Sequence, residues 1–285
     1  MYAVLGNPIS HSLSPKIFQL FAKQTQQQID YQAIQVKPEN LAVELQRLHR
    51  QGYQGVNLTT PLKEKALSLA KTLSEAARAA GAINVLSFHP DGSYHGHNSD
   101  GAGFIRDLKN KNYAITDKAI LILGAGGAVR GLLTALLQES PKQIVIYNRT
   151  EAKACQLIAD FQGTPTPMTS SNWQDLNKSR FDLLIHGTTL GLQGETLPFP
   201  GAILNPNACC YDLSYGKTAL PFLTWSRQQG AAYCYDGLGM LVEQAAEAYS
   251  MWRGQTVNTT LIYRTLLTPL PPLRQRRGGE GSYEY

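Results

Sequence analysis

Residues 118–127, KAILILGAGG, constrain the fold of this chain more than any other segment. An apolar stretch typical of a buried strand enters a turn that contains Gly124, Gly126 and Gly127. Residues 128–140, AVRGLLTALLQES, then have the apolar spacing of a helix, and the next strand follows at residues 143–150. A strand, a glycine turn, a helix and a second strand in this order indicate an α/β unit.

The same alternation of strand and helix runs through most of the chain, so we expect an α/β architecture overall. In the first third, we expect helices at residues 14–24 and 38–52 and strands at 2–6, 31–36, 55–59 and 82–88. The pair Asp91-Gly92 after the fourth strand predicts a hairpin turn. Beyond residue 150, we expect a helix at 218–230, two helices within 240–267, and strands at 181–187, 208–214 and 231–237.

Composition narrows the functional classes. A length of 285 residues fits two domains, and 43% hydrophobic with 16% charged residues is ordinary for a globular protein. The net charge of +5 is mild and partly concentrated in the C-terminal RQRR, which argues against a nucleic-acid partner. The chain shows no leader and no apolar run of membrane length, and its four cysteines form no C-x-x-C pair and no zinc spacing. We therefore expect a cytoplasmic protein with no membrane or metal partner.

The glycine-rich turn also indicates a ligand. Gly124 allows the tight turn, while Gly126 and Gly127 let the backbone approach a pyrophosphate that faces the N–H groups of the following helix. Val129 stands where the usual dinucleotide fingerprint has its third glycine. A tight turn without a ligand is the alternative, although the strand–turn–helix context favours a dinucleotide site.

The end of the next strand indicates which dinucleotide binds. An NAD site usually has an acidic residue about 20 positions after the glycines, where it accepts a hydrogen bond from the ribose 2′-hydroxyl. Here Asn148 and Arg149 occupy that place, followed by Thr150 and Lys153. A guanidinium can bind a 2′-phosphate through two parallel hydrogen bonds, so the segment predicts NADP. Glu151, as the second residue of an expected helix, more simply complements the helix dipole.

Two residues in the first hundred are candidates for proton transfer. Thr60 and Pro61 have the pattern of an N-cap and first helical residue, which places Lys63 in the first turn, where the helix dipole would lower the lysine pKa. Asp100 supplies a carboxylate that one hypothesis pairs with Lys63 beside a substrate that gains or loses a proton. The plainer interpretations are a solvated surface lysine and a helix N-cap.

The segment NPISHSLSPKIF, residues 7–18, has serines at every second position, Ser10, Ser12 and Ser14, just after the first expected strand. In an extended chain alternate side chains point to the same side, so the hydroxyls would form one row. The alternative is a polar turn in which Ser14 caps a helix that begins at Pro15.

Eight short segments together resemble the shikimate dehydrogenases, from about residue 2 to about residue 265. In chain order they are SHSLSP, NLTTPLK, GAINV, NSDG, GAGGA, NRT, DLSYGK and DGLGMLVEQAA. The resemblance implies reversible, NADP-linked reduction of 3-dehydroshikimate to shikimate, on the path to chorismate and the aromatic amino acids. It also implies two α/β domains with a cleft between them. A substrate domain would comprise residues 1–100, completed by helices at 239–267, and a Rossmann-like NADP domain would comprise 101–238. The tail, residues 269–285, lies outside the resemblance and is expected to be disordered.

The resemblance assigns roles by position. Lys63 matches the catalytic lysine, with Asp100 as its partner, and hydride would pass to the C3 carbonyl carbon while Lys63 donates a proton to the oxygen. Ser12 and Ser14 match residues that bind the substrate carboxylate. The matches to residues that bind the ring hydroxyls are Thr59, Asn84, Asp100, Tyr215 and Gln244. The matches to cofactor-binding positions are Glu75, Gly124, Ala125, Gly126, Gly127, Ala128, Asn148, Arg149, Thr150, Lys153, Leu213 and Gly237.

One segment departs from the family pattern. In HGTTLG, residues 186–191, His186 and Gly187 stand where the family often has Asn and Ala, near the expected nicotinamide. We expect this departure to affect cofactor affinity, with His186 either packing at a strand end or contacting the ligand. Three other functions stay open: a quinate/shikimate dehydrogenase that prefers NAD, a non-catalytic NADP-binding sensor and a folate-linked dehydrogenase. Similar enzymes occur as monomers and as dimers, so a homodimer also stays open.

Overall fold

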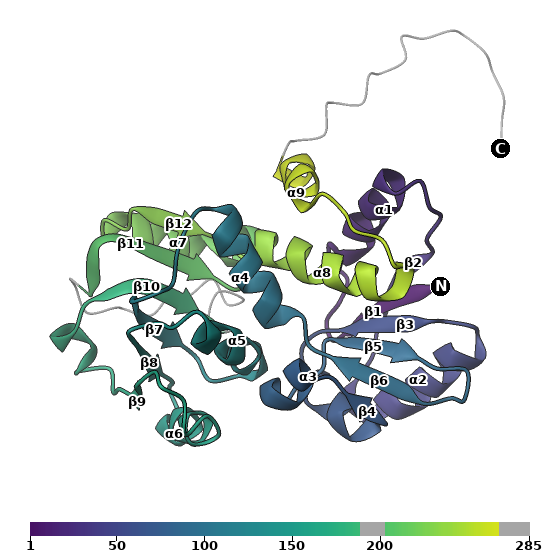
Figure 1. Cartoon of the computed structure of the whole chain (residues 1–285), viewed down its shortest axis with the longest axis horizontal. Coiled ribbons are helices and arrows are strands. Elements are labelled where there is room, and N and C mark those ends of the chain that lie inside the picture. The colour runs from purple at the N-terminus through teal and green to yellow at the C-terminus, as the bar shows by residue number, and fades with distance from the viewer. Residues whose placement is uncertain (189–202, 268–285) are drawn as a thin grey trace, which may run out of the picture.

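The computed structural model describes residues 1–188 and 203–267 of the chain. Its strands form two six-stranded sheets, and helices pack against each sheet, so the expected two-domain α/β fold is confirmed (Figure 1). α4 (Asp100–Asn110) and α8 (Leu238–Arg253) lie between the two sheets. The tail at 269–285, for which we expect disorder, lies outside the described residues.

The first sheet has the strand order β2-β1-β3-β5-β6-β4. At one side, β1 (Tyr2–Gly6) runs parallel to both β2 (Tyr31–Gln35) and β3 (Gly55–Leu58). The expected hairpin is formed by β5 (Val85–Phe88) and β6 (Tyr94–His97), which are antiparallel, and β4 (Thr72–Leu73) pairs with β6 at the edge. The helices of this domain are α1 (Ser14–Gln24), α2 (Leu41–Arg50) and α3 (Glu75–Ala80).

Both faces of the first sheet are covered because the side chains of β1 alternate between two cores. Tyr2 and Val4 belong to a cluster that includes residues of α1 and α8. Ala3 and Leu5 belong to a second cluster, formed with the apolar face of α2. Because successive side chains of β1 point to opposite faces, the strand lies between these two clusters, and the polar segment begins where it ends.

All strands of the second sheet are parallel, in the order β12-β11-β10-β7-β8-β9. Their bounds are β7 Ala119–Leu123, β8 Gln143–Tyr147, β9 Met168–Ser170, β10 Phe181–His186, β11 Leu204–Asp212 and β12 Tyr233–Tyr235. The helices of this domain are α5 (Gly127–Gln138), α6 (Glu151–Ala159) and α7 (Leu220–Gln228). Numbered within the domain, the order is 6-5-4-1-2-3, that of doubly wound dinucleotide-binding folds. Such folds bind their ligands beyond the carboxyl ends of the strands where the order reverses, here β7 and β10.

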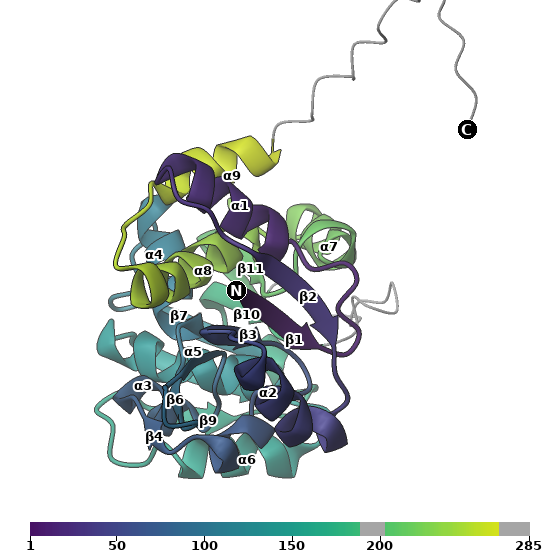
Figure 2. The ribbon, with the colours of Figure 1, turned by 90° about the vertical axis from the view of Figure 1, so that its right-hand side faces the viewer.

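α4 and α8 pack together closely because glycines face the neighbouring helix. A Cβ at Gly103 of α4 would lie 2.8 Å from the backbone nitrogen of Gln244 on α8. A Cβ at Gly239 of α8 would overlap the carboxyl group of Asp107 on α4. The last helix, α9 (Thr259–Leu267), lies beside α1 of the first domain, as Figures 1 and 2 show.

The α-helix expected to begin at Thr60 does not form, so that expectation is wrong. The chain makes a turn there, in which the Leu62 N–H donates to the Thr59 carbonyl at 2.9 Å, and only a 3₁₀-helix follows at Lys65–Leu69. Lys63 therefore precedes the helical residues, and the expected effect of a helix dipole on it does not apply. Three further short 3₁₀-helices complete the described elements, at Pro38–Asn40, Leu176–Lys178 and Gly216–Thr218.

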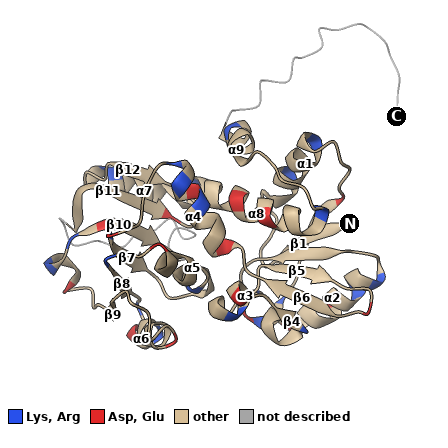
Figure 3. Ribbon diagram, in the orientation of Figure 1, with Lys and Arg blue, Asp and Glu red and all other residues tan. Residues whose placement is uncertain are grey.

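Charged residues of both signs are distributed over both domains, including α4 and α8 (Figure 3). A surface for the nucleic-acid backbone would instead collect one sign of charge on one face. Among the described helices, none is long and apolar enough to span a bilayer.

Candidate active site

Lys63 and Asp100 are 37 positions apart in the sequence and in direct contact in the structure. The Nζ of Lys63 donates to Oδ2 of Asp100 at 2.6 Å, and the two side chains are 17% and 5% exposed. Lys63 is held in the turn after β3 because its carbonyl accepts from the Ile83 N–H at 2.9 Å. Asp100 is the first residue of α4, where the helix dipole favours a carboxylate. The result is a mostly buried ion pair whose lysine is still partly open to solvent.

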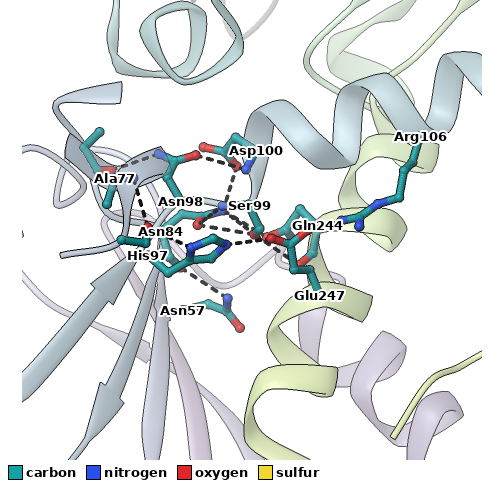
Figure 4. Close-up of polar contacts among 12 residues, drawn as sticks. Asn57, Ala77, Asn84, His97, Asn98, Ser99, Asp100, Arg106, Gln244 and Glu247 are labelled. Carbon is teal, nitrogen blue, oxygen red and sulfur yellow. Dashed lines mark hydrogen bonds and ion pairs between the residues drawn. The ribbon is translucent and has the colours of Figure 1, made fainter. Parts of the chain in front are cut away.

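Asn84 holds the carboxylate of Asp100 in place (Figure 4). Its Nδ2 donates to Asp100 Oδ1 at 2.8 Å, to Ser99 Oγ at 3.1 Å and to Gln244 Oε1 at 3.2 Å. Its Oδ1 accepts from the Ser99 N–H at 2.9 Å. Asn84, Asp100 and Gln244, each matched to a residue that binds ring hydroxyls, are therefore brought together in one buried network.

The serine segment does not form an extended row, so that expectation is wrong. The chain turns at residues 10–11, which leaves Ser10 exposed and Ser14 buried. Ser12 Oγ accepts from the Ser14 N–H at 3.3 Å, which ties the two residues together. Ser14 is the first residue of α1 and does not cap it through its side chain. Nearby, burial raises the pKa of the Tyr31 phenol well above its usual value, and this phenol donates to Asn57 Oδ1 at 2.7 Å.

Two further substrate candidates border the serine segment. Tyr215 comes from the loop after β11 in the second domain, and its phenol lies near the backbone of Leu13. Burial raises the pKa of Tyr215, so its hydroxyl stays protonated near neutral pH. Thr59 follows β3, and its Cγ2 lies 2.4 Å from where a Cβ on Gly6 would be, so only glycine fits at the end of β1. Residues from both domains therefore meet at the serine segment.

The ion pair adjoins the glycine-rich turn. Glu64, next to Lys63, reaches α5, where its Oε1 lies 3.0 Å from the position that a Cβ on Gly127 would take. Asp100 also packs on α5, with its Cβ 3.4 Å from the Cβ position of Gly131. The candidate proton-transfer pair and the candidate dinucleotide turn therefore lie next to each other.

The glycine-rich turn has the shape that a pyrophosphate requires. Gly124 adopts φ +110°, and a Cβ there would lie 2.8 Å from the carbonyl oxygen of Gly187, so the position needs glycine. A Cβ on Gly126 would meet nothing within 4 Å, so open space lies in front of the turn. Gly126 is the N-cap of α5, whose first N–H groups have no side-chain cap. A cradle open in front, at a helix N-terminus, fits a dinucleotide phosphate. Ala125 lies between Gly124 and Gly126, and Ala128 follows Gly127.

The segment after β8 presents basic groups. Asn148 Nδ2 donates to the Thr150 carbonyl at 2.8 Å, which closes the turn before α6. Arg149 and Lys153 are exposed, and neither has an ion-pair partner in residues 1–188 and 203–267. Glu151 is the first residue of α6 rather than the second, and it remains in the helical turn that complements the dipole.

The remaining cofactor candidates divide into a pair and one separate residue. The Gly237 N–H donates to the Ser214 carbonyl at 2.8 Å, and a Cβ on Gly237 would lie 2.4 Å from the Leu213 oxygen, so Leu213 and Gly237 are in contact. Glu75 opens α3 with an exposed side chain, and no interaction among the described residues connects it with the glycine-rich turn.

His186 packs at the end of β10, where it is 1% exposed. Its Nδ1 contacts Asp212 Oδ2 at 2.9 Å, its Nε2 contacts Thr188 Oγ1 at 2.6 Å, and its ring stacks on Phe222. Asp212 Oδ1 also accepts from the N–H of Ser214 at 2.8 Å. His186 therefore supports the loop that carries Leu213 and Tyr215; residues 189–191 of the departing segment lie outside the described residues.

Comparison with known proteins decides the family. Family models for the shikimate dehydrogenase substrate-binding domain, for shikimate/quinate 5-dehydrogenase and for the shikimate 5'-dehydrogenase C-terminal domain match residues 4–86, 107–190 and 237–267. A shikimate dehydrogenase (NADP(+)) from Coxiella burnetii is 44% identical over 266 residues, which cover 93% of this chain and 97% of the relative. The chain belongs to the shikimate dehydrogenase family.

Two solved structures superpose over almost the whole chain. The Ael1 enzyme from Pseudomonas putida has a TM-score of 0.85 at 39% identity, covering 95% of this chain and 99% of its own. The shikimate 5-dehydrogenase from Thermus thermophilus, solved with NADP(H) and shikimate, has a TM-score of 0.81 at 29% identity, covering 92% and 97%.

Several residues of the buried network have no role predicted from the sequence. Asn98 and Ser99 lie within the NSDG segment, so the motif itself carried a signal beyond Asp100. His97 and Glu247 make a further contact beside the network, and no local motif connects them because they are 150 positions apart. In the described ranges, no group of His, Cys, Asp and Glu residues is placed to hold a metal ion.

Proposed function

We propose that this chain is an NADP-dependent oxidoreductase that catalyses the reversible reduction of 3-dehydroshikimate to shikimate. The observation that carries the proposal is the 2.6 Å contact between Lys63 and Asp100, next to the glycine-rich turn of a dinucleotide-binding sheet. The relatives named above support the same reaction, because one is a shikimate dehydrogenase (NADP(+)) and another was solved with NADP(H) and shikimate.

Lys63 supplies the proton in this reaction. Its ammonium group is partly exposed beside Asp100, so it can reach a carbonyl oxygen of a substrate bound next to the ion pair. In the reduction the ammonium form of Lys63 donates a proton to that oxygen, and in the oxidation its neutral amine takes the proton from the hydroxyl. Asp100 orients the ammonium group and accepts a hydrogen bond from a hydroxyl on the substrate ring. Its own position is fixed by Asn84.

The substrate is held by groups from both domains. Ser12 and Ser14 offer hydroxyls to the carboxylate, near the phenol of Tyr215. Thr59, Asn84 and Gln244 bind the ring hydroxyls, and Asn84 and Gln244 already share a hydrogen bond. We therefore assign substrate binding to residues 1–100 with the helices at 239–267, and NADP binding to residues 101–238.

The dinucleotide site fits NADP better than NAD. The turn from Gly124 to Ala128 would hold the pyrophosphate, and Asn148 to Lys153 would hold the adenosine 2′-phosphate through the exposed cations of Arg149 and Lys153. Leu213 and Gly237 would border the nicotinamide, with Glu75 as a more distant contact. When bound, NADPH supplies the hydride.

The proposal is tested by the initial rate of shikimate oxidation by the purified protein, with NADP and NAD compared in parallel. We expect turnover with a clear preference for NADP. A preference for NAD would keep the dehydrogenase and overturn the role of Arg149. No turnover with either dinucleotide, from folded protein, would favour the non-catalytic sensor. Fractionation of the cells that produce the protein would test the expected cytoplasmic compartment. Sedimentation of the purified protein would test whether it dimerises.

A further inference from the structure

A second row of polar contacts lies beside the substrate network (Figure 4). His97, the last residue of β6, contacts Glu247 Oε1 on α8 through Nε2 at 2.6 Å. Its other ring nitrogen, Nδ1, contacts Ser74 Oγ at 2.8 Å. The other oxygen of Glu247 binds the guanidinium of Arg106 on α4. The row therefore connects the first sheet with both of the helices that lie between the domains.

The contact between His97 and Glu247 is a well-defined hydrogen bond. Because a carboxylate only accepts, the Nε2 nitrogen of His97 carries the proton. Burial raises the pKa of Glu247, but the hydrogen bond from His97 and the charge of Arg106 outweigh burial, so the pKa lies below its usual value. The two side chains are 15% and 20% exposed, so water competes weakly for this bond.

The row resembles a Ser–His–Glu triad in its order, but its serine is committed elsewhere. Ser74 Oγ is the N-cap of α3 and accepts from the Ala77 N–H at 3.1 Å. A nucleophile needs a hydroxyl that is free to approach a substrate carbonyl. The geometry therefore favours a positioning role over hydrolytic chemistry.

His97 and Glu247 are each adjacent to a residue of the substrate network. The His97 carbonyl accepts from the Asn84 N–H at 3.1 Å, and Glu247 lies one helical turn after Gln244 on α8. Asn84 and Gln244 are themselves joined by a 3.2 Å hydrogen bond. The sheet and α8 are thus held together by two neighbouring bonds, one within the substrate network and one outside it.

We propose that His97 and Glu247 are positioning residues, which hold Gln244 against Asn84 so that both can bind the hydroxyls of the shikimate ring. The inference rests on the proposed function, because it concerns the same substrate site. Neither residue touches the Lys63–Asp100 pair, so loss of the contact should weaken substrate binding more than it slows the chemical step.

The test compares Glu247→Ala, His97→Ala and Glu247→Gln by steady-state kinetics at saturating NADP. For each alanine variant we expect the KM for shikimate to rise roughly tenfold, which corresponds to about 1.4 kcal/mol, with kcat within about threefold of the parent. Glu247→Gln keeps an acceptor for His97 Nε2–H, so its KM should stay close to that of the parent. The double alanine variant should raise the KM by less than the product of the two single effects, because both single changes remove the same bond.

Calorimetric titration with NADP, which does not depend on turnover, checks that each variant retains its fold and its cofactor site. Glu139→Ala is the matched control, since it breaks a 2.6 Å ion pair with Lys109 on α4 that has no link to Asn84 or Gln244. An unchanged KM in the alanine variants, or a Glu247→Gln variant as impaired as Glu247→Ala, would overturn the inference. A parent protein without shikimate turnover would instead overturn the proposed function.

Discussion

At the scale of single residues, the substrate site depends on groups that share hydrogen bonds. The side-chain amide of Asn84 has two N–H bonds, and three acceptors lie within reach: Asp100, Ser99 and Gln244. Both oxygens of Asp100 are occupied, by Asn84 and by Lys63. Because each group sets the position of the next, a ring hydroxyl that enters this network meets donors and acceptors that are already oriented.

Arg149 is expected to set the preference for NADP. Its guanidinium is exposed and has no ion-pair partner among the described residues, so it can bind a 2′-phosphate without breaking another contact. A hydrogen bond to a charged group contributes about 1.5–3 kcal/mol. In Arg149→Ala we therefore expect the Kd for NADP to rise about 10- to 100-fold, as measured by calorimetry.

The same titration with NAD separates a phosphate contact from general damage. The Kd for NAD should change little in Arg149→Ala, since NAD lacks the 2′-phosphate. Glu151→Gln, two residues away and also exposed, is a control for the local change in charge. Equal losses for both dinucleotides would contradict the assigned role of Arg149.

At the scale of elements, the carboxyl ends of β10 and β11 form one support for the cofactor and substrate loops. The Leu213 N–H donates to the His186 carbonyl at 2.9 Å, and the Gly187 N–H donates to the Leu123 carbonyl at 2.8 Å. The side chains of His186 and Asp212 reinforce this backbone pairing from within the core. The loop that carries Leu213 and Tyr215 is therefore fixed to the glycine-rich turn.

Replacing His186 should weaken this support. In His186→Ala, the buried carboxylate of Asp212 loses one of its partners and the ring no longer fills the space beside Phe222. Leaving a buried acceptor without its hydrogen-bond partner costs about 1–3 kcal/mol. We expect a clear fall in the melting temperature and a weaker Kd for NADP. His89→Ala, which changes an exposed histidine in the loop between β5 and β6, should alter neither quantity, and an unchanged melting temperature in His186→Ala would contradict this account.

Elements with strong local patterns were predictable from the sequence. Residues 14–24 form α1 within the expected bounds, and the hairpin at Asp91-Gly92 forms as the turn chemistry indicates. The α-helix expected after Thr60 fails because a proline after a threonine also suits a turn, and nothing local distinguishes the two. β4, two residues long, is set by pairing with β6 and therefore has no local signal.

The site divides in the same way. Lys63, Asp100 and the glycine-rich turn could be named because each belongs to a short motif. That Lys63 contacts Asp100 was a hypothesis from the sequence, and only the fold brings the two within 2.6 Å. The contact of His97 with Glu247 depends on how α8 packs against β6, which no local pattern determines.

At the scale of the whole molecule, α4 and α8 serve both domains. Phe104 and Leu108 of α4 and Met240 of α8 belong to the core of the second domain, whereas Val242 and Tyr249 of α8 belong to the core of the first. Asp100 opens α4, and Gln244 lies within α8, so both ends of the substrate network are fixed by these two helices. The packing of α4 on α8 therefore sets the geometry of the site.

A side chain at Gly103 should disturb that packing and the site together. In Gly103→Ala the new methyl group would lie 2.8 Å from the backbone nitrogen of Gln244, so the helices must move apart. Overpacking of this kind costs about 1–3 kcal/mol. We expect a lower melting temperature and a higher KM for shikimate. The control is Ala102→Ser, at the preceding, half-exposed position of α4. A normal KM in Gly103→Ala would argue against the coupling between helix packing and the substrate site.

Proton transfer by Lys63 is the central claim, and its most direct test is kcat for shikimate oxidation in Lys63→Ala, set beside the Kd for shikimate. General acid–base catalysis contributes roughly 10²- to 10⁴-fold, so kcat should fall by that factor while the Kd changes little. Lys65→Ala, an exposed lysine two positions on, should keep the parent rate. A Lys63→Ala protein that turns over as fast as its parent would contradict the account.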